Sequence, residues 1–126
     1  IAPDVEIGAG SVIFAQAVIQ PCCRIGDGAI VNTAATVDHD CILGGFVHIS
    51  PGAHLAGGTQ IGGGSWIGIG ACTRQQIKIG ANVIVGAGAA VVSDVSDGLT
   101  VVGNPAKPLI RPSENTLAAK SEQAGG

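Results

Sequence analysis

The chain has 126 residues, a net charge of −3, two phenylalanines, one tryptophan and no tyrosine. This length indicates one domain, and the acidic balance argues against a nucleic-acid partner. No apolar run approaches the ~20 residues that cross a bilayer, and no signal peptide is recognisable. So few aromatic residues would leave an ordinary globular core poorly filled.

A period of six residues runs through most of the chain. Stepping by six from Ile1 to Val91 gives sixteen positions, of which fifteen are aliphatic and one is Thr73. The residue four places later in each hexad is small or β-branched, and glycines gather between the two positions. Neither an amphipathic helix nor a single alternating strand produces this pattern, whereas repeat proteins do.

The hexads predict an all-β solenoid of short parallel strands, with three hexads in each coil and the aliphatic position facing inward. Each coil should rise by about 4.8 Å, the spacing of neighbouring strands. Roughly five coils are expected, each stacking a residue on its copy eighteen positions away. We therefore expect a β-helix domain over residues 1–96.

Four cysteines raise the question of disulfides. Cys23 and Cys41 occupy the same inward position one coil apart, so their backbones could lie within bridging distance. Both stand where the pattern calls for a small apolar residue, a role that free cysteine fills well. We favour free thiols, and hence a reducing, cytoplasmic compartment.

The third coil contains all three histidines, within residues 37–54. His39 is followed directly by Asp40 and falls at an outward-facing corner, where an ordinary solvated surface residue is the simplest interpretation. The adjacent carboxylate favours a catalytic role for His39 instead, because it can orient an imidazole and raise its basicity. Glycines one coil further on, starting at Gly57, would leave bare backbone beside this base.

After Val95 the period ends. Asp97-Gly98 is typical of a turn, and Pro105 and Pro108 should prevent another coil. Residues 97–126 are therefore expected to form a loop and tail, in which the polar end is either a short helix or disordered.

These motifs carry a family resemblance. GGGSWIGIGAC, IKIGANVIVGAGAAVVSDV and VVGNPAKP resemble the acyl-CoA-dependent hexapeptide acyltransferases, whose fold is a left-handed parallel β-helix. The segment NTAATVDHDCILGGFVHISPGAHLAGGTQIG is similar to the sialic-acid O-acetyltransferase and UDP-4-amino-sugar N-acetyltransferase group, often called NeuD-like. Members usually also carry an N-terminal Rossmann-like domain, which these 126 residues do not contain.

The resemblance implies an acetyl-CoA-dependent transferase that acetylates the oxygen or nitrogen of a small-molecule sugar or nucleotide sugar. His39 would be the general base and Asp40 its acidic partner. His48 would contact acetyl-CoA near the thioester. The remaining cofactor positions would be Gly57, Ile69 and Ala87 along the pantetheine groove and the loop Gly103, Asn104, Pro105, Ala106 and Lys107 near the nucleotide. The resemblance also implies a homotrimer with active sites between subunits.

Two other functions stay open. A gamma-class carbonic anhydrase has a similar fold and binds zinc through three histidines, but His39, His48 and His54 do not fall at one place of their hexads. The third interpretation is a non-catalytic β-helix scaffold, which would bind no cofactor and tolerate loss of His39.

Overall fold

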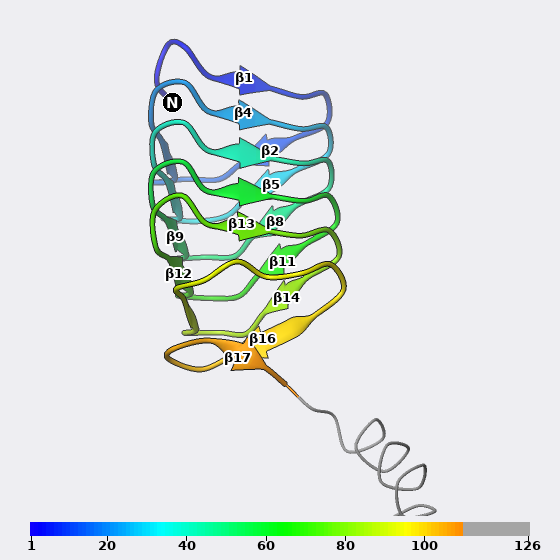
Figure 1. The fold of residues 1–126 in the computed structure, drawn as a ribbon. Helices are drawn as coiled ribbons and strands as arrows, with labels where there is room; N and C mark the ends of the chain where they lie inside the picture. The colour runs from blue at the N-terminus through cyan, green and yellow to red at the C-terminus, as the bar shows by residue number, and fades with distance from the viewer. Residues whose placement is uncertain (110–126) are drawn as a thin grey trace, which may run out of the picture.

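A computed structural model describes residues 1–109, and in this part of the chain the only regular elements are β-strands. The strands are stacked in coils that form a three-sided prism (Figure 1). The architecture is the predicted left-handed parallel β-helix of about five coils.

Each side of the prism is one sheet. Face A contains β1 (Glu6–Ile7), β4 (Arg24–Ile25), β7 (Ile42–Leu43), β10 (Gln60–Ile61) and β13 (Lys78–Ile79). Face B contains β2 (Val12–Ile13), β5 (Ile30–Val31), β8 (His48–Ile49), β11 (Trp66–Ile67), β14 (Ile84–Val85), β16 (Thr100–Val102) and β17 (Lys107–Pro108). Face C contains β3 (Val18–Ile19), β6 (Thr36–Val37), β9 (His54–Leu55), β12 (Cys72–Thr73) and β15 (Ala90–Val91).

The hexad column forms the core, as predicted. Strands pair in parallel with a register of eighteen residues, for example Ile25 with Leu43 and Ile49 with Ile67. Every position of the column from Ile19 to Val91 is buried. Burial of aliphatic side chains on three converging faces therefore replaces the aromatic packing of a globular core.

The corners of the prism share one backbone conformation. The fourth residue of nearly every hexad has a positive φ, which glycine adopts freely and other residues adopt at a cost. Asp40 has a φ of 58° there, and Gln76 has a φ of 56°. The tight turn leaves the third and fourth residues of most hexads on the outside of the prism, so a corner can carry functional side chains without disturbing the core.

Two buried cysteine thiols lie in the core, next to corners of the prism. The Cys23 thiol donates a hydrogen bond to the Asp38 carbonyl at 2.9 Å, and the Cys41 thiol donates one to the Ala56 carbonyl at 3.3 Å. Both are free cysteines, as are the exposed Cys22 and Cys72. Each buried thiol thus supports the carbonyl of the next coil's corner.

The end of the prism differs from the expected loop. After Ile79 the register shortens to sixteen residues, as in the pairing of Ile84 with Thr100. Strand β16 then continues face B, and β17 folds back on it antiparallel (Figure 1). Pro108 is accommodated because β17 is an edge strand, which does not need every backbone donor, and Pro105 lies in the turn that precedes it. The polar tail beyond Leu109 lies outside the described residues.

No helix in residues 1–109 has the length and apolar character needed to cross a membrane.

Candidate functional site

His39 and Asp40 form a pair at the corner between faces C and A. His39 Nδ1 lies 3.0 Å from Asp40 Oδ2, and the His39 side chain is 62% exposed. The His39 backbone N–H donates to Asp38 Oδ1 at 2.9 Å, and the Asp40 N–H donates to the Pro21 carbonyl at 3.1 Å. A carboxylate can only accept, so Nδ1 is the protonated nitrogen and Nε2 carries the lone pair. This is the arrangement of an oriented base.

The imidazole rests against Gly57 of the next coil. A Cβ atom on Gly57 would lie 2.6 Å from both Cε1 and Nε2 of His39, so only glycine leaves room for the ring in this position. Gly57 is buried, and its neighbour Gly58 donates its N–H to the His39 carbonyl at 2.9 Å. The two coils are thus held together beneath the ring.

A small pocket surrounds this base. Its polar lining combines carboxylates from one coil with the amides of Gln75 and Gln76 from two coils further on. Its full lining is Asp38, His39, Asp40, Ala56, Gly57, Gly58, Gln75 and Gln76. Such a pocket offers hydrogen bonds to a polar acceptor beside a proton-accepting nitrogen.

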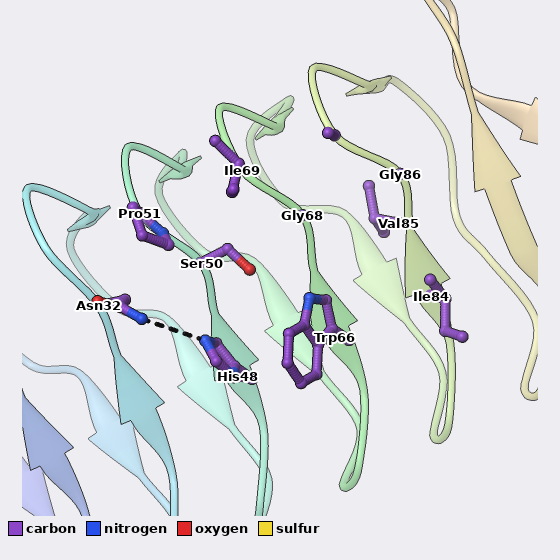
Figure 2. A pocket seen from close by; sticks show the side chains of 11 residues that line it. Asn32, His48, Ser50, Pro51, Trp66, Gly68, Ile69, Ile84, Val85 and Gly86 are labelled. Atoms are coloured by element: carbon purple, nitrogen blue, oxygen red, sulfur yellow. Dashed lines mark hydrogen bonds between the residues drawn. The ribbon is translucent and has the colours of Figure 1, made fainter.

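A second, apolar groove runs along face B and its corner with face C (Figure 2). His48 lies in it beneath Trp66, with ring centroids 4.0 Å apart and planes tilted by 36°. Burial lowers the pKa of His48 and so favours its neutral form. The groove is lined by Asn32, His48, Ser50, Pro51, Trp66, Gly68, Ile69, Ile84, Val85, Gly86 and Ala87.

Asn32 determines which nitrogen of His48 is protonated. Its Nδ2 lies 3.4 Å from His48 Nε2, as the dashed line in Figure 2 marks. An amide NH₂ donates, so Nε2 accepts and the proton sits on Nδ1. His48 therefore presents a hydrogen-bond donor, which a thioester oxygen could accept.

The structure brings together some of the predicted cofactor positions and separates others. His48, Ile69 and Ala87 line the face B groove. The Gly103 carbonyl accepts from the Ala90 N–H at 2.9 Å, which places the Gly103–Lys107 loop at the end of the same row of corners. Gly57 lies instead beside His39, at another corner of the prism.

The three histidines do not converge within the chain. His54 faces outward from face C, where its Nδ1 lies 2.7 Å from Thr36 Oγ1, whereas His39 is at a corner and His48 is on face B. In the described part of the chain, no three His, Cys, Asp or Glu side chains gather as a metal site would require.

Sequence reasoning gave no role in the site to several residues that line it. The eighteen-residue register pairs Trp66 with His48, but nothing in the repeat indicates that Trp66 lines the groove. The hexad pattern marks Asn32, Gln75 and Gln76 only as polar residues near corners. The eighteen-residue offset would have found the glutamines, because they stand directly above Gly57 and Gly58.

Solved structures resemble this chain closely. The acetyltransferase domain of PglB from Neisseria gonorrhoeae FA1090, in complex with acetyl coenzyme A, has a TM-score of 0.85 and 62% identity, covering 86% of this chain and 53% of that one. PerB from Caulobacter crescentus, in complex with CoA and GDP-perosamine, has a TM-score of 0.85 and 44% identity, covering 86% and 52%. WeeI from Acinetobacter baumannii AYE has a TM-score of 0.81 and 38% identity, covering 83% and 52%.

This chain therefore spans about half the length of each of these relatives. No protein-family model and no curated protein matches the sequence.

Proposed function

We propose that this chain, which belongs to the hexapeptide-repeat acyltransferases, transfers an acetyl group from acetyl-CoA to the amine of a nucleotide-linked amino sugar. The chain corresponds to the β-helix domain of the sugar-acetylating members of that family. The observation that carries the proposal is the His39–Asp40 pair, with Nδ1 held at 3.0 Å from the carboxylate and Nε2 left as the base. The nitrogen acceptor is favoured because PerB, at 44% identity, was crystallised with GDP-perosamine.

The reaction is a direct transfer. His39 Nε2 removes a proton from the acceptor amine as its nitrogen attacks the thioester carbonyl. His48 Nδ1–H is available to stabilise the oxyanion. When the tetrahedral intermediate collapses, the C–S bond breaks and coenzyme A leaves with the proton returned by His39. The cysteines take no part, so no covalent enzyme intermediate forms.

The donor occupies the face B groove in this proposal. Its walls, from Trp66, Ile69 and Ile84, are apolar and exposed, which suits the pantetheine arm. The Gly103–Lys107 loop would meet the nucleotide end of coenzyme A, where exposed Lys107 can pair with phosphate.

We propose that the complete site forms between two subunits of a homotrimer. His39 and the groove lie at different corners of one prism, so a cyclic assembly is needed to bring the base of one subunit to the donor of the next. Face B supplies an exposed apolar surface for such contacts, with Val12, Trp66 and Ile84 each about half exposed. The free thiols accord with a cytoplasmic location.

Thermal unfolding with and without millimolar acetyl-CoA, beside a metal analysis, is the first test. A ligand at ~100 times its dissociation constant stabilises the folded state by about 2.7 kcal/mol. We expect a clear upward shift in metal-free protein, followed by turnover of a nucleotide-linked amino sugar that His39→Ala abolishes and His54→Gln leaves unchanged. Stoichiometric zinc without a shift would favour the carbonic anhydrase. The absence of both a shift and bound zinc would favour the scaffold.

Mixing variants tests the shared site. Subunits carrying His39→Ala and subunits carrying His48→Ala are co-assembled in equal amounts. If each site draws one histidine from each neighbour, about a quarter of the sites regain both, so about a quarter of the parent activity returns. No recovery above the separate variants would contradict a site between subunits.

A further inference from the structure

Thr73 is the one position in the hexad column that is not aliphatic, although it is buried like its neighbours, with only 8% of its surface exposed. Its hydroxyl has two partners. Thr73 Oγ1 accepts from the Ala56 N–H at 3.1 Å and lies 3.0 Å from Thr59 Oγ1. Thr59 is fully buried and donates to the Ala56 carbonyl at 2.7 Å.

These contacts close a ring. The Ala56 N–H donates to Thr73, Thr73 donates its hydroxyl to Thr59, and Thr59 donates to the Ala56 carbonyl. This order follows because each hydroxyl has one proton and the carbonyl can only accept. Thr59 and Thr73 thus hold both polar groups of Ala56, whose carbonyl also accepts from the Cys41 thiol at 3.3 Å.

The ring replaces a main-chain hydrogen bond that the other coils make. At the matching place one coil earlier, the Asp38 N–H donates to the Leu55 carbonyl at 2.9 Å. The Ala56 N–H donates to the Thr73 side chain instead, and β9 pairs with β12 only through His54 and Cys72. The ladder is therefore interrupted at Ala56.

The interrupted ladder at Ala56 is adjacent to the residue that supports the His39 imidazole. Ala56 precedes Gly57, on which the His39 ring rests with no space for a Cβ between them. A corner displaced by a few tenths of an ångström would move the support of the ring, because the next peptide is rigid and planar. The departure from the repeat and the seat of the imidazole are therefore parts of one local structure.

We propose that Thr59 and Thr73 are positioning residues that hold the Ala56–Gly57 corner out of the regular ladder and thereby seat the His39 imidazole for catalysis. The claim rests on the proposed function, since it gives His39 the role of base. Neither threonine touches the pocket around His39, so each acts through Gly57. A valine at position 73 would fit the aliphatic column and let the Ala56 N–H return to a main-chain carbonyl.

The test compares Thr73→Val with Thr73→Ser, which keeps the hydroxyl, and with Ser65→Ala. Ser65 is a matched control because it is buried and its hydroxyl donates to the Gly80 carbonyl at 2.7 Å, at a corner away from His39. We expect Thr73→Val to lower kcat by about tenfold or more with the KM for acetyl-CoA unchanged. Thr73→Ser and Ser65→Ala should stay within about twofold of the parent kcat.

A double-mutant cycle separates positioning from general damage. In a His39→Ala background, Thr73→Val should lower whatever rate remains no further, because the imidazole that it positions is gone. Thr59→Val breaks the hydrogen-bonded ring of Ala56, Thr73 and Thr59 at its other hydroxyl and should lower kcat to a similar extent. This second variant keeps the test decisive if Thr73→Val does not fold. An undiminished kcat in both valine variants, or an equal loss without His39, overturns the proposal.

Crystal structures of the parent and Thr73→Val supply a readout that needs no activity. We expect the Ala56 N–H bonded to the carbonyl of residue 73, and the His39 ring moved from Gly57. An unmoved ring overturns the positioning role even when the protein is an active transferase. A parent without transferase activity but with a ring that moves in the variant would instead overturn the proposed function alone.

Discussion

Gly57→Ala is the most direct test of how the base is held. The new Cβ would lie 2.6 Å from the His39 ring, whereas ordinary contacts begin at 3.4 Å, so the ring would have to move by about 0.8 Å. A misplacement of ~1 Å can lower a rate by about a hundredfold, which corresponds to about 2.7 kcal/mol in the activation free energy. Because the His39 side chain is exposed and can rotate, this change should appear in kcat and hardly in stability.

Gly45→Ala is the matched control. Gly45 occupies the same place of its hexad at the next corner, where a Cβ would meet only the Asp27 carbonyl, at 3.4 Å. Steady-state kinetics with acetyl-CoA and an amino-sugar acceptor should give a kcat about a hundredfold lower for Gly57→Ala, and a near-parental kcat for Gly45→Ala. A folded Gly57→Ala protein with a kcat within about threefold of the parent would refute the reasoning.

Three further predictions concern titration and access. A thiol reagent should label Cys22 and Cys72 in the native protein and all four cysteines in denaturant, since Cys23 and Cys41 are buried. Burial raises the pKa of Cys41 to about 12, so the unfolded chain loses this proton first and stability should fall as the pH rises from about 9 toward 12. Unfolding midpoints measured over this pH range should fall less in Cys41→Ala than in the parent. Burial lowers the pKa of His48, so the unfolded chain binds the proton first as the pH falls below about 6.5; thermal unfolding between pH 7 and 5 should show a smaller loss of stability in His48→Gln.

The period alone was enough to predict the solenoid. In a narrow prism each residue stacks on its own copy, so a six-residue pattern determines the inward column, the parallel register and the number of coils. The buried column from Ile19 to Val91 and the pairing of Trp66 with His48 followed from counting. The C-terminal end of the prism was less predictable, because the register shortens to sixteen residues where Ile84 pairs with Thr100. The six-residue pattern gives no signal of this change in register.

The site was predictable only in part. His39 and Asp40 are adjacent in the sequence, so their contact could be expected, and the observed 3.0 Å agrees with it. The contact between Gly57 and the imidazole depends on the direction of a side chain at a corner, which periodicity does not specify. The separation of Gly57 from His48 in one prism, by contrast, follows from counting, because Gly57 is eighteen residues from His39 and only nine from His48.

Thr73 illustrates why exceptions in a repeat are informative. In a structure where every coil can satisfy its backbone with the coil above, a buried hydroxyl in an apolar column costs free energy unless it is hydrogen-bonded. Thr73 is bonded to a backbone N–H that its counterparts leave to main-chain carbonyls. An aliphatic residue there would be expected to leave the ladder continuous, so we attribute to the threonine a geometry that the regular coil does not form. That geometry lies next to Gly57, against which the His39 imidazole, oriented by the Asp40 carboxylate, is packed.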